Sequence, residues 1–457
     1  MSRDDRRKYF VVYTSKKPKA VAAAAKQVRI RQMPVRDVDG LPVIVDQFGR
    51  PETTFLGFIL TYSSLSKNTL EQYGNALARF ANFMSATFCE IPAKATASQI
   101  DLYKRTRLHL QSKPIQPISF KPEAAVLRNY FLWLEQSNLI EKSPILRTSR
   151  AGTDLLHVRA IGQNRVRYVS KEAFRKFIDS AEGSNRIHNL RRADLRNVAV
   201  IKTLVSAGMR LQEVSTLLSC EVDTAVRRSQ VWEFDIQAAA KNGKRRTIYL
   251  DIYALRAIEK YRKIERRHIV KSNQERFRDH LDELFVVESI DPKSGMVSGS
   301  WGMSGPHLKY EIRSTPVDIR RKIVSINKHG FVEPLALFLS QSRGLPMSRS
   351  GWEQVFRKIS EQAFFGKEYY SEPHISPHDL RHTFAINYLR YRYAQMVTQE
   401  QEDLAHPLLD PLVDLQEILG HSSMAQTMRY LRLLNKLDEG VAASLKSYVG
   451  ELYGEEK

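Results

Sequence analysis

The sequence has two cysteines in 457 residues, Cys89 and Cys220, which lie far apart and show no CxxC spacing. This scarcity excludes a disulfide framework and a cysteine-based zinc site, and it is typical of a reducing cytosol. No apolar run approaches the length of a transmembrane helix, and the charged start MSRDDRRKYF lacks the apolar stretch of a signal peptide. We therefore expect a cytoplasmic protein without membrane attachment.

Two features of cofactor-dependent enzymes are also missing from the sequence. It contains no glycine-rich phosphate-binding loop and no cluster of acidic residues spaced as metal ligands. We therefore expect the protein to work without a nucleotide, a metal ion or another cofactor.

Negative charge is in short supply. Lys and Arg number 71 against 50 Asp and Glu, which gives a formal net charge of +21. The first 160 residues hold 25 of these cations and 13 of the acids, so they carry more than half of the excess. A strongly basic chain is typical of nucleic-acid binding, because phosphate neutralisation dominates the affinity. A generally solvated cationic surface is the alternative explanation.

Composition and hydrophobic spacing divide the chain into four parts. Residues 1–60 form a basic extension with short apolar stretches, and residues 61–148 repeat apolar residues at helical spacing. Residues 149–167 carry Gly, Ser and Arg without clear periodicity and are predicted to be a linker. We interpret residues 168–457 as one mostly helical domain with a small sheet. The expected fold is mainly α, with an all-α first domain and an α+β second domain.

Within the second domain, helices are predicted over SKEAFRKFIDSAE and over DLRNVAVIKTLVSAG, the latter ended by Gly208. The stretch VWEFDIQAAAKNGKRRTIYLDI alternates like two strands about an Asn-Gly turn, which is a strong hairpin signal. Residues 270–334 are poorly periodic and are expected to form an insertion with long loops. The tail at residues 434–457 has regularly spaced apolar residues and is expected to dock on a neighbouring protomer.

Six polar residues lie in segments of this domain that otherwise resemble core. They are Arg210, Lys241, His378, Arg381, His421 and Tyr430. Arginine guanidiniums bind phosphate oxygens in pairs, and tyrosine is a nucleophile that can form a covalent intermediate. Taken singly, each residue has an ordinary structural explanation, because arginines at helix starts and lysines beside turns are usually solvated.

The positions of the basic residues suit an anion site. Arg210 follows a helix stop at the start of a new helix, where an anion is favoured. Lys241 borders the predicted turn, from which it can protonate a leaving oxygen, and Lys244 on the other side of the turn is its competitor. His378 and Arg381 are three residues apart and share one face of a helix, so that both can meet one phosphate.

A break between two helices separates the last two of the six residues. His421 follows a Leu-Gly helix stop, and Ser422 and Ser423 can cap a second helix that is predicted to end near Tyr430. One continuous helix would place the histidine and the tyrosine on opposite faces, so the break lets both reach one site. The neighbouring His382 is more typical of a structural hydrogen bond than of catalysis.

In order and spacing the six residues resemble the motifs of the tyrosine recombinases, also called phage-type integrases. The resemblance rests on AGMRLQEV, the hairpin lysine, HDLRH, LGHSS and the tyrosine nine residues past that last histidine. It covers residues 168–445 well and residues 61–148 loosely. It implies an all-α core-binding domain of SAM-like fold followed by the α+β catalytic domain. The implied roles are phosphate clamping by Arg210 and Arg381, protonation of the leaving 5′ oxygen by Lys241, shared proton transfer by His378, a phosphate hydrogen bond from His421 and nucleophilic attack by Tyr430.

The function implied by this resemblance is that of a site-specific recombinase or integrase of a mobile element. Such an enzyme cuts and rejoins DNA through a 3′-phosphotyrosyl intermediate and a Holliday junction. The implied partners are double-stranded DNA with specific recombination sites, a homotetramer on paired sites and accessory DNA-bending proteins, with association to the bacterial nucleoid on DNA binding. Three alternatives stay open: a type IB topoisomerase, a telomere-resolving enzyme and a DNA-binding module without catalysis.

Overall fold

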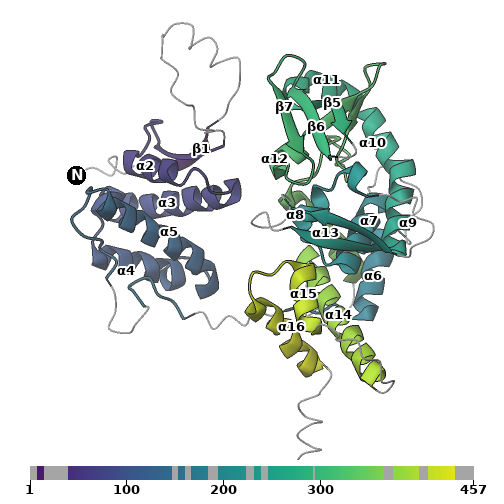
Figure 1. Ribbon diagram of the computed structural model, residues 1–457. Coiled ribbons are helices and arrows are strands. Elements are labelled where there is room, and N and C mark those ends of the chain that lie inside the picture. Colours follow the sequence, from purple (N-terminus) through teal and green to yellow (C-terminus); the bar gives the residue numbers. More distant parts are fainter. Residues whose placement is uncertain are drawn as a thin grey trace, which may run out of the picture. The chain divides into compact units, whose positions relative to one another are not determined.

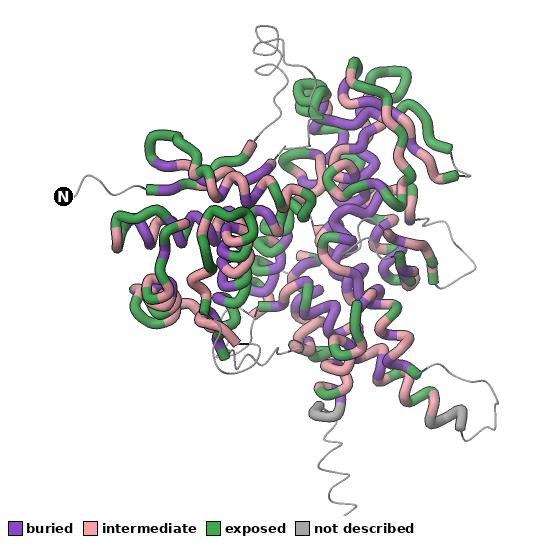
Figure 2. Tube along the Cα trace, turned by 60° about the vertical axis from the view of Figure 1, so that its left-hand side comes forward, coloured by how far each residue is buried: buried purple, intermediate pink, exposed green. Residues whose placement is uncertain are grey.

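The computed structural model describes residues 8–14, 40–146, 153–159, 166–183, 194–222, 231–237, 245–291, 294–364, 374–400 and 410–437. Its contacts divide the chain into two compact units, Met1–Arg165 and Val166–Lys457 (Figure 1). Each unit has its own hydrophobic core. Buried residues line the inward sides of the helices in both units (Figure 2).

The first unit combines a two-stranded hairpin with a helical bundle. Its elements are β1 (Tyr9–Tyr13), β2 (Pro42–Asp46), α2 (Thr53–Thr61), α3 (Lys67–Phe88), the 3-10 turn η2 (Pro92–Lys94), α4 (Ala97–Arg105), the π-helical turn η3 (Thr106–Leu110) and α5 (Pro117–Gln136). Local capping sets two of the helix starts, because Ser66 accepts from the Thr69 N–H at α3 and Thr96 forms a capping box with Gln99 at α4.

The hairpin belongs to the core of this unit. Strands β1 and β2 pair antiparallel, and the side chains of Tyr9 and Ile44 are buried with Phe55 and Phe58 of α2. In α3, Gly74 makes room for the hairpin, since a Cβ there would lie 2.6 Å from the Cβ of Pro42. The described part of residues 1–60 therefore packs into the first unit, whereas its sequence suggested an extension. The pairing joins segments that are distant in sequence, so local periodicity does not reveal it.

The second unit is mostly helical. Its first half contains α6 (Lys171–Ala181), α7 (Asp194–Ala207), α8 (Leu211–Ser215), η4 (Ser219–Glu221), β3 (Val231–Ile236), β4 (Arg246–Asp251), α9 (Ile252–Tyr261), η6 (Arg262–Arg266), α10 (Arg267–Ser272), α11 (Gln274–Asp279) and η7 (Leu281–Glu283). Its second half contains β5 (Phe285–Asp291), β6 (Met296–Trp301), β7 (His307–Glu311), α12 (Val317–Arg320), β8 (Ile323–Ile326), β9 (Val332–Pro334), α13 (Arg349–Phe364), α14 (Pro377–Glu400), α15 (Pro411–Leu419) and α16 (Met424–Leu437). The architecture is mainly α with small sheets, as the sequence predicted.

The hairpin signal in this unit was correct for its strands. Strand β3 pairs antiparallel with β4 over their full lengths, from Val231 opposite Asp251 to Ile236 opposite Arg246. The connecting turn lies outside the described residues, and so do Lys241 and Lys244.

Residues 270–334 differ from the long loops that their sequence suggested. They contain the end of α10, the short helices α11 and α12, the 3-10 turn η7 and a five-stranded sheet with the order β7-β6-β5-β8-β9. The central strands β5 and β8 pair in parallel, and Leu218, Phe285 and Leu335 share a small core beneath the sheet. The strands are short, and the one parallel pair, β5 with β8, joins segments that are not consecutive in sequence, so the sequence carries little of the period-2 signal that identifies strands.

Among the described helices, none combines the length and the apolar character that spanning a membrane requires.

Candidate active site

The site begins where helix α7 ends. Gly208 adopts a left-handed backbone with φ of +58°, and a Cβ there would clash with the ring of Phe384 in α14. This close approach brings α14 against the α7–α8 turn, so that Arg381 Nη1 donates to the Gly208 carbonyl at 2.6 Å. Arg210 follows as the N-cap of α8, and its backbone N–H donates to the Glu213 carboxylate at 2.6 Å. The glycine stop therefore sets both arginines in place.

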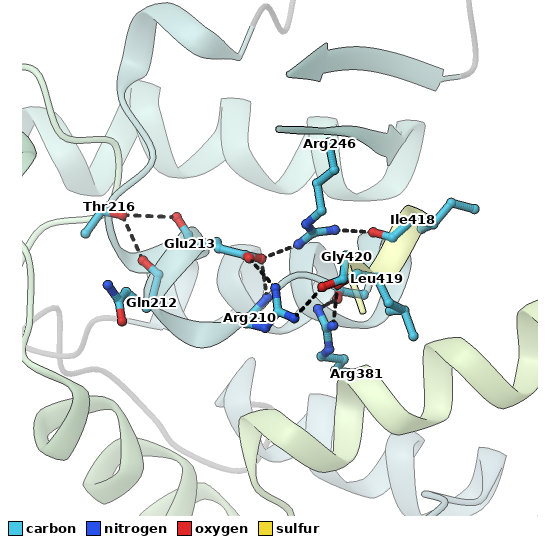
Figure 3. Close-up of polar contacts among 10 residues, drawn as sticks. Arg210, Gln212, Glu213, Thr216, Arg246, Arg381, Ile418, Leu419 and Gly420 are labelled. Carbon is cyan, nitrogen blue, oxygen red and sulfur yellow. Dashed lines mark hydrogen bonds and ion pairs between the residues drawn. The ribbon is translucent and has the colours of Figure 1, made fainter. Parts of the chain in front are cut away.

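Three arginines from three different elements meet the C-terminal end of α15 (Figure 3). Arg246 of β4 donates to the carbonyl of Ile418, Arg381 to that of Leu419 at 2.6 Å, and Arg210 to that of Gly420 at 3.1 Å. The last carbonyls of a helix lack intrahelical partners and carry partial negative charge, which a guanidinium satisfies. The helix end and the arginines thus fix each other's positions.

A single carboxylate joins two of these arginines. Glu213 accepts from Arg210 Nη1 at 3.0 Å and from Arg246 Nη2, and its own side chain is fully buried. Three guanidiniums thus surround one carboxylate and one helix end, which leaves an excess of positive charge. Arg210 keeps 26% of its side chain exposed, so an anion from solvent can still reach that guanidinium. This combination suits a phosphate group.

Helix α15 ends at Gly420, whose left-handed φ of +62° turns the chain toward α16. His421 follows, and its Nδ1 lies 3.0 Å from Thr427 Oγ1, which fixes the orientation of the imidazole. The ring of His421 stacks on that of Tyr430 with centroids 5.9 Å apart. The predicted break between the two helices is therefore present, and it brings His421 and Tyr430 together. The helix that carries Tyr430 extends to Leu437, seven residues farther than predicted, because Leu434 is buried against α14 and α15.

The hydroxyl of Tyr430 meets His382, a residue whose position in the sequence is more typical of a structural hydrogen bond. His382 Nδ1 lies 3.0 Å from Tyr430 Oη, and both side chains are buried. His378 lies one helical turn before His382 on α14, and the centroids of the two rings are 4.1 Å apart. A capping interaction starts this helix, since Ser376 N–H donates to Asp379 Oδ2 at 2.8 Å.

Burial and the cationic surroundings shift the ionisation of these groups. Burial, reinforced by His378 and nearby arginines, lowers the pKa of His382 to about 3, and burial with Arg381 lowers that of His421 to about 3. Burial raises the pKa of Tyr430, although Arg381 opposes the rise. Burial and the charge of Arg210 lower the pKa of Arg381 to about 9, so it stays cationic at neutral pH. The site thus combines neutral imidazoles and a phenol with fixed guanidiniums.

The structure brings together five of the six predicted residues: Arg210, His378, Arg381, His421 and Tyr430. The sixth, Lys241, lies outside the described residues, as do residues 438–457 of the expected docking tail.

The sequence did not single out two participants, Glu213 and Arg246, whereas it predicted a structural hydrogen bond for His382, which lies 3.0 Å from Tyr430 Oη. For Glu213 a signal existed, because an acid three residues after a helix start is a capping-box position. For Arg246, which lies two residues after Lys244, the sequence offered no comparable signal.

Chemically, the arrangement can hold a phosphodiester against guanidiniums while a buried phenol attacks it. Among the described residues, no three His, Cys, Asp or Glu side chains gather as metal ligands would.

The chain matches a known protein family over part of its length and is similar to several known proteins. The model of the phage integrase family matches residues 176–406, which is half of the chain and includes Arg210 and Arg381. The tyrosine recombinase XerC of Listeria monocytogenes is 21% identical over 384 residues, covering 84% of this chain and 93% of its own length. XerC of Oceanobacillus iheyensis is 22% identical over 381 residues, covering 82% and 89%.

Two solved structures have similar chains. One is the XerH site-specific recombinase bound to palindromic difH substrate in a post-cleavage complex, with 17% identity, a TM-score of 0.49 and coverage of 83% of this chain and 81% of that one. The other is the Tn1549 transposon integrase in complex with circular intermediate DNA, with 15% identity, a TM-score of 0.46 and coverage of 83% and 94%.

Proposed function

Because this chain belongs to the phage integrase family and is a site-specific tyrosine recombinase, we propose that it breaks and rejoins double-stranded DNA through a 3′-phosphotyrosyl bond at Tyr430. The observation that carries the proposal is the position of this phenol. It is buried beside His382 and His421, and although burial raises its pKa, the charge of the Arg381 guanidinium opposes that rise. A nucleophile beside fixed cations is what attack on a phosphodiester requires.

In the proposed reaction Tyr430 Oη attacks the scissile phosphorus while Arg210 and Arg381 bind its non-bridging oxygens. The bond from phosphorus to O5′ breaks, and O5′ takes a proton from Lys241. The phenolic proton of Tyr430 passes to a neighbouring base of the site as the bond to phosphorus forms. His421 hydrogen-bonds the phosphate, and His378 shares in proton transfer. The covalent bond keeps the energy of the phosphodiester, so the reverse step rejoins DNA without ATP. Guanidiniums supply the charge stabilisation that a metal ion would otherwise give.

At the level of the assembly, we propose that four protomers act on two paired sites and exchange strands through a Holliday junction. The first 160 residues supply much of the DNA affinity, since they carry more than half of the chain's excess positive charge. The tail beyond α16 docks on a neighbouring protomer, as its regularly spaced apolar residues suggest. The enzyme is the recombinase of a mobile element, and accessory DNA-bending proteins help to bring the two recombination sites together.

The decisive test uses a nicked suicide duplex that carries the DNA flanking the gene. Wild-type protein is expected to form a covalent complex that survives a denaturing gel, both with excess EDTA and without ATP. Tyr430→Phe should form none while still binding the duplex. An adduct that persists in Tyr430→Phe would move the nucleophile elsewhere, and loss on chelation with recovery in magnesium would contradict the metal-free reaction.

A second substrate separates recombination from the related chemistry. Two paired sites on one supercoiled plasmid should give recombinant products. Relaxation of a plasmid without sites would instead indicate a topoisomerase, and hairpin ends would indicate a telomere-resolving enzyme.

A further inference from the structure

The hydroxyl of Tyr430 shares a hydrogen bond with His382, which stands outside the six predicted residues. The distance from His382 Nδ1 to Tyr430 Oη is 3.0 Å, and the two rings lie at 58° with centroids 5.4 Å apart. Tyr430 is 1% exposed and His382 is 5% exposed, so bulk water has little access to this bond.

Both groups of this hydrogen bond are neutral in the free protein. Burial raises the pKa of Tyr430, so the group is a phenol at neutral pH. Burial and neighbouring cations lower the pKa of His382, so its imidazole is neutral. Either atom can then donate, depending on the tautomer of the imidazole. In the tautomer that carries its proton on Nε2, Nδ1 accepts from the phenol, and this is the tautomer that a base at this position requires.

The other two histidines of the site are engaged differently. His421 Nδ1 contacts Thr427 Oγ1, and its ring lies nearly parallel to the Tyr430 ring, at 8° with centroids 5.9 Å apart. The ring of His378 contacts that of His382. Of the three, His382 is the histidine whose nitrogen meets the oxygen that must lose a proton.

We propose that His382 is a catalytic residue that accepts the phenolic proton of Tyr430 during DNA cleavage and returns it during rejoining. This inference rests on the proposed function of the same site. As the bond from Tyr430 Oη to phosphorus forms, the Oη proton moves to His382 Nδ1 and gives an imidazolium. The bond from phosphorus to O5′ breaks, and O5′ takes a proton from Lys241. Rejoining reverses both transfers, so no proton is gained or lost over the cycle.

The anionic substrate makes this transfer feasible. In the free protein His382 faces His378, Arg381, Arg429 and His421, and the cations among these groups disfavour an imidazolium. A bound phosphodiester brings negative charge against the same arginines, and further charge develops on its oxygens in the transition state. Both changes favour the protonated imidazole. Attack on phosphorus also makes the phenolic proton more acidic, so the base is needed only when substrate is bound.

The test compares His382→Ala and His382→Asn with wild-type protein under single-turnover conditions on the suicide duplex. The Asn amide stands where Nδ1 stood and can hold the phenol, but it cannot take its proton. Both variants should form the covalent complex about 100-fold more slowly, with unchanged affinity for the duplex. Added imidazole should accelerate His382→Ala and leave His382→Asn slow. Near-ultraviolet circular dichroism checks the fold, and His382→Asn carries the test if the Ala variant unfolds.

Three results would overturn the inference. His382→Asn cleaving at the wild-type rate would reduce the residue to a hydrogen-bonding support. A folded His382→Ala that imidazole does not accelerate would exclude proton acceptance. Recovery of either variant on a duplex with a 5′-thiol leaving group would place the residue on the leaving-group side. If the adduct forms at Tyr430 at a rate that does not depend on His382, this inference alone is refuted. If wild-type protein forms no adduct at Tyr430, the proposed function is refuted.

Discussion

Glu213 and Arg246 form an ion pair in which the carboxylate side chain is fully buried and the guanidinium side chain is 3% exposed. The same carboxylate binds Arg210, and each arginine also caps one carbonyl at the end of α15. Neither Glu213 nor Arg246 is placed to meet an anion from solvent first, because Arg210 is the more exposed partner. Their effect is to hold Arg210 and the turn before His421 in one geometry.

Replacing Glu213 should therefore damage stability and cleavage together. Removing one partner of a buried ion pair costs about 3–5 kcal/mol, because it leaves the other charge uncompensated. We expect a loss of this size in the free energy of unfolding for Glu213→Ala, measured by urea denaturation, with slower covalent-complex formation. The matched control is Glu353→Ala, which removes an exposed i,i+4 partner of Arg349 and should cost about 0.5 kcal/mol or less. Equal effects of the two changes would contradict the role of Glu213.

Gly420 should tolerate no side chain. Its φ is +62°, and an added Cβ would lie 2.7 Å from Cδ of Arg246. Gly420→Ala is expected to cost about 1–2 kcal/mol for the left-handed backbone alone, with a further loss from displaced Arg246. The control is Gly330→Ala, which has a similar φ of +73° and open space around it. Both variants should lose stability in thermal melts, and only Gly420→Ala should lose cleavage.

The buried histidines should make the protein less stable in mild acid. The pKa of His382 is about 3 in the folded protein, whereas an unfolded histidine titrates near about 6.5. Between these values the unfolded chain binds more protons, so the stabilisation is fully present above the unfolded pKa and is lost as pH falls toward the folded one. Each such histidine contributes a slope of about 1.4 kcal/mol per pH unit in this window.

The contribution of His382 can be isolated by difference. Urea midpoints from pH 7 to pH 4 should fall more steeply for wild-type protein than for His382→Asn, which has no group to protonate at this position. Parallel curves for the two proteins would show that His382 already titrates normally when folded.

The inserted sheet should support the arginine site through Arg320. This residue is buried at the end of α12, donates to the Thr216 carbonyl at 3.0 Å next to α8, and pairs with Glu221. Arg320→Ala is expected to lower the free energy of unfolding by about 3–5 kcal/mol. The exposed Arg349→Ala is the control and should change it by about 0.5 kcal/mol or less. A small effect of Arg320→Ala would mean that the sheet is held by its apolar core alone.

The lysines beside the β3–β4 turn should differ in their response to the leaving group. Lys241→Ala is expected to cleave an ordinary duplex slowly and to recover on a 5′-thiol duplex, because a thiolate leaves without protonation. Lys244→Ala should cleave both duplexes alike. Rescue of Lys244→Ala instead would reverse the assignment.

Much of this protein is readable from local sequence. The glycine that ends α7, the Ser-Ser segment before α16 and the alternation of β3 and β4 each depend on neighbouring residues, so their signals survive without tertiary context. The same holds for the order of the six polar residues, because order and spacing can be read directly from the sequence.

Tertiary structure alone decided the rest. The parallel pairing of β5 with β8 and the hairpin inside the first unit join distant segments, and no local period records such contacts. The pairing of Glu213 with Arg246 and the contact of His382 with Tyr430 depend on which face of each helix or strand is buried against another. A guanidinium or an imidazole gains its role from the charges and carbonyls that packing brings within hydrogen-bonding distance, and these come from segments that are remote in sequence.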